Sequence, residues 1–290
     1  MHFTRRRFLA AAVGGVAAVG GAFAYARHVE PGWLRGSHIS VPLKNRKLDL
    51  PLRIAHLADF HASDEVPFSI IDEAVDLTVR NQPDLICVTG DFITTGMPSP
   101  RIYRSILQKL SAAAPTFAVT GNHDGGTWSH PRGGFQSTRE VKLLLEDSGI
   151  ELLSNRSTSW VGESSRVSLV GLGDLWAEES EPDIAFGGIQ ETDDPVIVLS
   201  HNPDSKSALK KYPWDLMLCG HTHGGQLRLP WGGTPFAPVR DHRFVHGLGA
   251  WEERWIHVTS GVGNLHGLRM NCRPEVALLT LTSEGEQGAG

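Results

Sequence analysis

Five short blocks of this chain end in side chains that readily bind metal ions. Within them, two aspartates, one asparagine and four histidines can each offer a ligand atom, and a fifth histidine is left over for chemistry. A set of that size suits a pair of divalent metal ions better than a single one. The seven candidate ligands are Asp59, His61, Asp91, Asn122, His201, His221 and His223, and the third block also holds His123 and Asp124.

The donor atoms narrow the choice of metal. Nitrogen and oxygen ligands without a thiolate suit Mn²⁺, Fe, Co²⁺, Ni²⁺ or Zn²⁺, and they argue against copper(I) and iron–sulfur clusters. We therefore expect two divalent metal ions per chain, with Mn²⁺ as the first choice and Fe, Zn²⁺, Ni²⁺ or Co²⁺ as alternatives. A carboxylate can bind one cation through each oxygen, and Asp91, which lies alone between the other blocks, is the best candidate for a bridge.

Such a pair of ions is suited to chemistry at phosphorus. Two ions about 4 Å apart stabilise both the attacking and the leaving oxygen of an in-line displacement, and a water that bridges them loses its proton near neutral pH. His123 follows Asn122 directly and need not bind metal, so it could protonate the leaving oxygen or stabilise charge on the phosphoryl group. Asp124 could orient that imidazole through a hydrogen bond.

The blocks follow short apolar runs that predict buried strands. In an open α/β sheet, ligands bind at the carboxyl edge of the strands, so residues far apart in sequence would meet there. Strands that lead into blocks are expected over residues 52–58, 84–89, 115–120, 195–200 and 215–219. Helices are expected over residues 69–80, 99–113, 137–148 and 203–211. Short strands without intervening helices follow from residue 151, which indicates one layered α/β domain with two sheets.

The first 26 residues have the composition of a targeting segment. Arg5, Arg6 and Arg7 precede Phe8-Leu9 and an apolar stretch rich in alanine and glycine. This pattern resembles a twin-arginine export signal, and an uncleaved N-terminal anchor is the alternative. We expect residues 27–50 to form a linker, because prolines interrupt them, and residues 51–290 to form the catalytic domain. The protein would then be exported by the twin-arginine machinery, and lie in the periplasm or tethered to the outer face of the inner membrane.

Composition excludes several classes of function. The chain has 290 residues, a formal charge of −5 and a pI near 6.3, so no basic surface for nucleic acid is expected. Three widely spaced cysteines without a CxxC pair indicate neither a zinc finger nor a disulfide framework.

The five blocks resemble the signature motifs of the calcineurin-like metallophosphoesterases, in the same order and with plausible spacing. This resemblance implies a four-layer α/β/β/α sandwich of two mixed sheets. It also implies that Asp59, His61, Asp91 and His223 surround one metal. Asp91, Asn122, His201 and His221 would surround the other, with His123 as the general acid. One position departs from the usual pattern, since Thr94 occupies the place where many members have a second aspartate.

We therefore expect a metal-dependent phosphoesterase, first of all a phosphodiesterase, in which a hydroxide that bridges the metals attacks phosphorus directly. One alternative is hydrolysis of a lipid-linked pyrophosphate such as UDP-2,3-diacylglucosamine. An alternative of another class is a non-catalytic metal-binding protein of the envelope. Small phosphodiesters or lipid-linked phosphates are the expected substrates, and the N-terminus could associate with a membrane. Arg269, Arg273 and the tryptophans Trp128, Trp176 and Trp231 could face the substrate or be ordinary packing residues.

Overall fold

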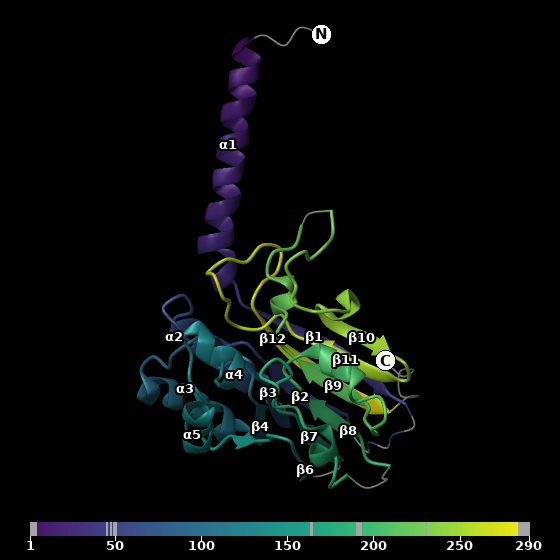
Figure 1. Cartoon of the computed structure of the whole chain (residues 1–290). Coiled ribbons are helices and arrows are strands. Elements are labelled where there is room, and N and C mark those ends of the chain that lie inside the picture. Colours follow the sequence, from purple (N-terminus) through teal and green to yellow (C-terminus); the bar gives the residue numbers. More distant parts are fainter. Residues whose placement is uncertain are drawn as a thin grey trace.

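The computed structural model describes residues 5–44, 46, 48, 51–162, 165–189, 193–229 and 231–283. Its centre is a pair of six-stranded mixed sheets (Figure 1). The first sheet has the order β1 (Arg35–Leu43), β12 (Glu275–Ser283), β2 (Leu52–Leu57), β3 (Leu85–Thr89), β4 (Thr116–Val119) and β5 (Glu151–Leu152). The second has the order β10 (Gly247–Trp251), β11 (Arg254–Val258), β9 (Leu216–Cys219), β8 (Val196–Leu199), β7 (Arg166–Gly171) and β6 (Arg156–Val161).

The first sheet is covered on both faces, which explains its continuous apolar strands. Strands β2, β3, β4 and β5 run parallel, and every residue of β3 is buried. Side chains alternate between faces along a strand. Leu85 and Cys87 of β3 pack toward the second sheet, whereas Ile86 and Val88 pack toward the helices. Those helices are α2 (Phe68–Arg80), α3 (Pro100–Ala113) and α5 (Arg139–Asp147).

The outer face of the second sheet is covered by short helical segments. Ala185 of α6 (Pro182–Ala185) and Phe244 of the 3₁₀ helix η5 (His242–Phe244) share an apolar cluster with Val198 and Met217. The expected helix over residues 203–211 is a 3₁₀ helix limited to η3 (Pro203–Ser207). The architecture is the four-layer α/β/β/α sandwich, with a fourth layer that is thinner than the first.

The expectation of a linker over residues 27–50 is wrong for its central part. Residues Arg35–Leu43 form β1, which pairs in parallel with β12 from Arg35 opposite Glu275 to Leu43 opposite Ser283. Pro42 was the residue that argued against a strand. Proline is tolerated on an edge strand, and β1 is the edge of its sheet. The catalytic domain therefore includes residues that precede position 51.

Ahead of β1, residues Arg5–His28 form one helix, α1, which extends away from the two sheets (Figure 1). A 3₁₀ turn, η1 (Glu30–Gly32), joins it to the strand. Within the described ranges, no helix has both the length and the hydropathy needed to cross a membrane.

Candidate metal centre

The two sheets bring all five blocks to a shared edge. Asp59 follows β2, Asp91 follows β3, and Asn122 follows β4, all in the first sheet. From the second sheet, His201 follows β8 and His221 follows β9. The sheets are joined at this point, because the backbone N–H of His221 donates to the Asp59 carboxylate at 3.0 and 3.2 Å. The predicted convergence at the carboxyl ends of the strands is confirmed.

One group of four candidate ligands is already assembled. The ligand atoms of Asp59, His61, Asp91 and His223 lie within 4.8 Å of one another, and all four residues are buried. His61 Nε2 lies 3.3 Å from Asp91 Oδ2, and His223 Nε2 lies 3.6 Å from Asp59 Oδ1. Buried carboxylates and imidazoles in this proximity form the environment expected of a cation site.

A second group lies on the other side of Asp91. His201 Nε2 is 3.1 Å from the same Asp91 Oδ2, and His221 Nδ1 is 3.2 Å from His201 Nε2. Asn122 is fixed beside them by its neighbours: the His123 N–H donates to Asp91 Oδ1 at 2.9 Å, and a Cβ at Gly121 would overlap that carboxylate. Asp91 is thus the residue that both groups share, as expected of a bridge.

The donor atoms fit bound metal. Among the described residues, Asn122 Oδ1 is buried without a hydrogen-bond partner, as is Nε2 of His221. Such orphaned atoms are costly unless a ligand satisfies them. The His201 ring pairs through Nδ1 with the Thr89 carbonyl at 2.7 Å, which leaves the Nε2 lone pair for a cation.

The backbone of the blocks is held in an unusual conformation. Asp59, His61, Asp91, His221 and His223 all have positive φ angles, between 47° and 68°. Non-glycine residues rarely adopt this region, and such strain clusters at functional sites where the surrounding structure enforces it. The turns after the strands therefore aim these side chains at one point.

Without metal, burial disfavours the charged forms of the candidate ligands and shifts their pKa values. Burial raises the pKa of Asp59 to about 7, with the nearby Asp91 carboxylate adding to the shift, and burial lowers the pKa of His61 to about 4. Burial also disfavours ionised Asp91, but the charges of neighbouring histidines, His201 first among them, and hydrogen bonds from His201 and His61 together outweigh it and hold the pKa of Asp91 well below its ordinary value. A divalent cation would reverse this balance, because it stabilises ionised carboxylates and neutral imidazoles together.

Chelation should therefore destabilise the protein, and more so as pH rises. In the unfolded chain Asp59 ionises near pH 4, and in the metal-free fold only near pH 7. Between these values the unfolded chain binds fewer protons at Asp59, so this carboxyl makes the metal-free fold less stable as pH rises, whereas neutral, buried His61 has the opposite effect between about pH 4 and 6.5. Protons also compete with a metal ion for these side chains, so bound metal should stabilise the fold more near pH 7.5 than near pH 5. We expect the melting temperature of metal-loaded protein to exceed that of EDTA-treated protein by at least about 5 °C near pH 7.5, and by less near pH 5. Equal melting temperatures near pH 7.5, measured by calorimetry with metal content checked, would contradict a bound metal.

His123 lies at the centre but outside both ligand groups. Its ring packs edge-on against His61 at 4.8 Å between centroids, and its Nδ1 pairs with the Thr94 carbonyl oxygen at 2.8 Å. The Thr94 hydroxyl lies 3.4 Å from His61 Nδ1. Thr94, the position that departs from the usual motif, therefore orients two histidines of the site.

The expected role of Asp124 is wrong in its detail. Its carboxylate accepts hydrogen bonds from four backbone N–H groups, whereas the Nδ1 atom of the His123 ring pairs with the Thr94 carbonyl. The donors are Asp91, Phe92, Ile93 and Gly121, at 2.7 to 3.3 Å. A carboxylate can satisfy several donors at once, so Asp124 ties the second block to the third. It positions the loops rather than the imidazole.

Two tryptophans flank the site, and sequence reasoning had left their role open. Trp128 packs against His123 at 4.6 Å between ring centroids, and Trp176 packs edge-on against His221 at 4.2 Å. Asp174 is not among the residues predicted from sequence, yet it is buried. Its carboxylate accepts a hydrogen bond from the backbone N–H of Trp176 at 2.7 Å, which fixes the turn that carries the Trp176 ring. Aspartate often accepts a hydrogen bond from the backbone N–H two residues further on and so indicates a turn, but it does not predict that the turn places a tryptophan beside the site.

The two undecided arginines have structural roles. Arg269 is fully buried and donates to the backbone carbonyls of Ser260, Gly261, Gly263 and Cys272. Arg273 donates to the Trp33 and Leu34 carbonyls and stacks on the Trp33 ring.

Comparison with known proteins places this geometry in a family. The family model described as Calcineurin-like phosphoesterase matches residues 52–225. The chain belongs to that family, and with its buried Asp and His cluster it is a metal-dependent phosphoester hydrolase. It is 44% identical to Phosphodiesterase YaeI of Escherichia coli (strain K12), over 96% of this chain and 99% of that protein.

Two further relatives are more distant. The chain is 31% identical to the metallophosphoesterase YkuE of Bacillus subtilis, over 97% of this chain and 98% of that protein. It is 27% identical to the UDP-2,3-diacylglucosamine pyrophosphatase LpxG of Chlamydia trachomatis, over 88% of this chain and 91% of that protein.

Proposed function

We propose that this protein is a phosphodiesterase that hydrolyses a small phosphodiester with two divalent metal ions, Mn²⁺ first among them. The observation that carries the proposal is the Asp91 carboxylate, whose Oδ2 lies 3.3 Å from His61 and 3.1 Å from His201, between two buried groups of ligands. The similarity to YaeI over nearly the whole chain supports the choice of a diester.

The chain's own residues divide the work. Bound metal would supply Lewis-acid activation of the phosphate and of the attacking water. The His123 ring, held through Nδ1 by the Thr94 carbonyl, keeps Nε2 available to hand a proton to the leaving oxygen. Trp128 and Trp176 offer apolar walls to the organic substituents of the ester, because each packs against a histidine of the site.

A lipid-linked pyrophosphate is the second candidate substrate. The similarity to LpxG over 88% of the chain favours it, because the name of that relative describes cleavage of such a compound. The third reading, a non-catalytic metal-binding envelope protein, is disfavoured, since all seven ligand residues are present and buried.

We also propose that the protein is exported by the twin-arginine machinery and works in the periplasm or at the outer face of the inner membrane. The pattern of Arg5-Arg6-Arg7-Phe8-Leu9 supports this proposal. The projection of α1 away from the sheets also supports it, because the projecting part of the helix can associate with a membrane or be removed without loss of contacts between the sheets (Figure 1).

A substrate screen tests the proposed activity. Purified full-length protein would be loaded in turn with Mn²⁺, Fe²⁺, Zn²⁺, Ni²⁺ or Co²⁺ and offered bis(p-nitrophenyl) phosphate, p-nitrophenyl phosphate and UDP-2,3-diacylglucosamine. We expect kcat/KM for the diester to exceed that for the monoester by at least about ten-fold, which is a difference of about 1.4 kcal/mol in transition-state stabilisation. Preference for the pyrophosphate would favour the second candidate, and no turnover at full metal content would favour the non-catalytic reading.

A further inference from the structure

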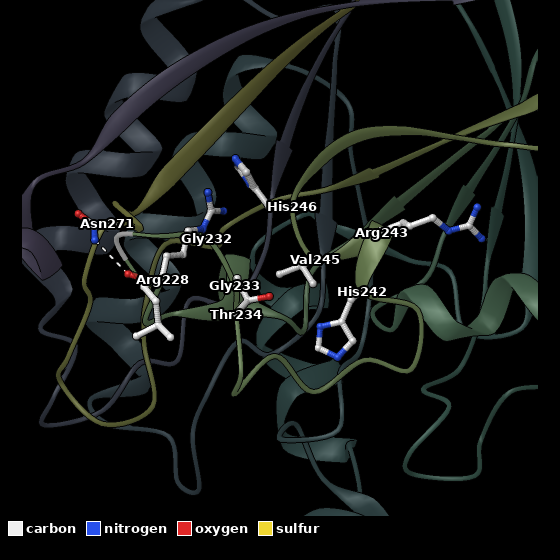
Figure 2. Close-up of a pocket in the computed structure, with 10 residues that line it drawn as sticks. Arg228, Gly232, Gly233, Thr234, His242, Arg243, Val245, His246 and Asn271 are labelled. Atoms are coloured by element: carbon white, nitrogen blue, oxygen red, sulfur yellow. Dashed lines mark hydrogen bonds between the residues drawn. The ribbon is translucent and has the colours of Figure 1, made fainter.

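A cavity of about 880 Å³ lies beside the loop that carries His221 and His223, although neither residue lines it (Figure 2). Two hydrogen bonds join its wall to that loop. The Thr222 hydroxyl donates to the Val245 carbonyl at 2.7 Å, and Arg228 Nε donates to the Gly224 carbonyl at 2.8 Å. The cavity is therefore a neighbour of the metal centre, built on the same loop.

Two arginines give the lining of this cavity its positive charge, whereas burial lowers the pKa of His246 to about 4. The lining includes Arg228, His242, Arg243 and His246, and no aspartate or glutamate is among the described residues that line the cavity. Arg243 already forms a two-pronged ion pair with Asp241, at 2.9 and 2.7 Å, and its side chain points away from the others (Figure 2).

Arg228 is the arginine that is available to a ligand. Within the described part of the chain, its guanidinium makes a hydrogen bond only through Nε, so both terminal amino groups remain for an anion. His246, which also lines the cavity, contacts the Ser260 hydroxyl at 3.0 Å, and the buried Glu275 carboxylate 3.6 Å from its Nδ1 is paired with Arg35 at 3.1 Å. A planar guanidinium whose two terminal amino groups remain for a ligand is suited to bind a phosphate group.

The rim of the cavity is apolar and exposed. Leu229 lines the opening, and Trp231 and Phe236 stand on the same loop, with 82% and 71% of their surfaces exposed. These two are the most exposed large hydrophobic residues of the described chain outside α1. Single exposed hydrophobic residues are ordinary, but three on one loop beside a basic pocket suggest an interaction surface. We call Leu229, Trp231 and Phe236 the apolar rim.

The turn η1, which directly follows α1, is attached to the same wall. The Glu30 carboxylate accepts from the backbone N–H groups of Asn271, at 2.9 Å, and Cys272, and the Asn271 side chain donates to the Arg228 carbonyl at 3.0 Å. Figure 1 shows α1 and the loop of the apolar rim extending from the same end of the body. Helix α1 itself exposes Val16, Val19 and Phe23, so this helix adds further apolar surface.

We propose that this end of the protein docks on a phospholipid membrane, with the apolar rim in the interfacial layer and Arg228 binding the phosphate of an anionic headgroup. Tryptophan and phenylalanine insert readily into that layer, and each arginine near an anionic surface adds to the attraction. The metal centre would then open beside the membrane surface.

Vesicle co-sedimentation with the full-length protein tests this surface. Vesicles of phosphatidylcholine would be compared with vesicles that also contain phosphatidylglycerol. We expect phosphatidylglycerol to strengthen binding and salt to weaken it. Arg228→Gln should lower the affinity for the anionic vesicles about five-fold, and the double variant Trp231→Ser with Phe236→Ser should lower it at least about ten-fold.

Two matched controls separate this surface from general effects. Arg243→Gln removes the same charge from the same cavity but should lower affinity less than about two-fold, because that arginine is engaged by Asp241. Val161→Ser with Ile184→Ser removes two exposed hydrophobic residues elsewhere and should leave binding intact. Thermal melting checks that each variant folds. If the double variant does not fold, the comparison of Arg228→Gln with Arg243→Gln tests the proposal.

Three outcomes would overturn the proposal. The first is full vesicle binding by the double variant, which would assign membrane association to α1 alone. The second is equal losses in Arg228→Gln and Arg243→Gln, which would reduce the effect to overall charge. The third is saturable binding of glycerol phosphate in calorimetry without vesicle binding, which would make the cavity a site for a soluble phosphate ester.

Discussion

An Asp91→Asn variant should lose at least about a thousand-fold in kcat/KM and should not retain its full complement of metal. Asp91 is the carboxylate shared by both ligand groups, and its Oδ1 also accepts the His123 N–H at 2.9 Å. Asparagine keeps the size but removes the charge, and it can offer only one oxygen where two positions need an acceptor. Metal content by plasma mass spectrometry and turnover of a generic diester during metal titration measure the two losses.

Asp84→Asn provides the matched control. Asp84 precedes β3, whereas Asp91 follows it, so the control removes a carboxylate from the opposite end of the same strand. Its partner is the partly exposed Arg53, at 2.9 Å, and we expect metal content and activity close to those of the unaltered protein. Full metal content and full activity of Asp91→Asn after chelation and metal add-back would refute the shared-ligand assignment.

The residues of the candidate metal centre were predictable from sequence because two local signals coincide there. Parallel strands covered on both faces must be apolar throughout, so β3 and β9 are visible as short hydrophobic runs. Asp91 and His221 then follow those runs within two residues. Since parallel strands share a carboxyl edge, the convergence of residues far apart in the chain follows from topology.

Two of the edge strands, β1 and β10, were not predictable in this way. Strand β1 has partly exposed positions through Ser40 and contains Pro42, and β10 begins Gly247-Leu248-Gly249 with no residue fully buried. Neither pattern carries the apolar run of a central strand. Each strand is defined by a partner, β12 for one and β11 for the other, and β12 is more than 200 positions away in sequence. Long-range pairing of half-exposed segments leaves little local signal.

Contacts made by the backbone were also beyond sequence reasoning. The acceptor for His123 Nδ1 is the carbonyl of Thr94, and every residue has a carbonyl. Asp124 was the obvious side-chain candidate because it is adjacent to His123, yet its two oxygens are used by four N–H groups of the neighbouring loops. Adjacency in sequence suggested Asp124 as the partner of the His123 ring, whereas the turn places the Thr94 carbonyl there.

His123→Gln should lower kcat by about a hundred- to ten-thousand-fold while metal content stays close to that of the unaltered protein. The imidazole lies outside both ligand groups, so its removal leaves the seven ligands in place. Its Nδ1 is engaged with Thr94, so Nε2 is the atom that can donate a proton. His130→Gln, which removes an exposed imidazole seven residues further along the chain, is the matched control and should leave kcat unchanged within about two-fold.

The leaving group decides between the two roles that His123 could have. An alkoxide needs a proton as it departs, whereas p-nitrophenolate departs readily without one. If His123 is a general acid, the loss in His123→Gln should be at least about ten-fold greater for a dialkyl diester, which must expel an alkoxide, than for bis(p-nitrophenyl) phosphate. An equal loss with both leaving groups would show instead that the imidazole stabilises charge on the phosphoryl oxygens. Loss of metal in His123→Gln would contradict both roles and would place this histidine among the ligands.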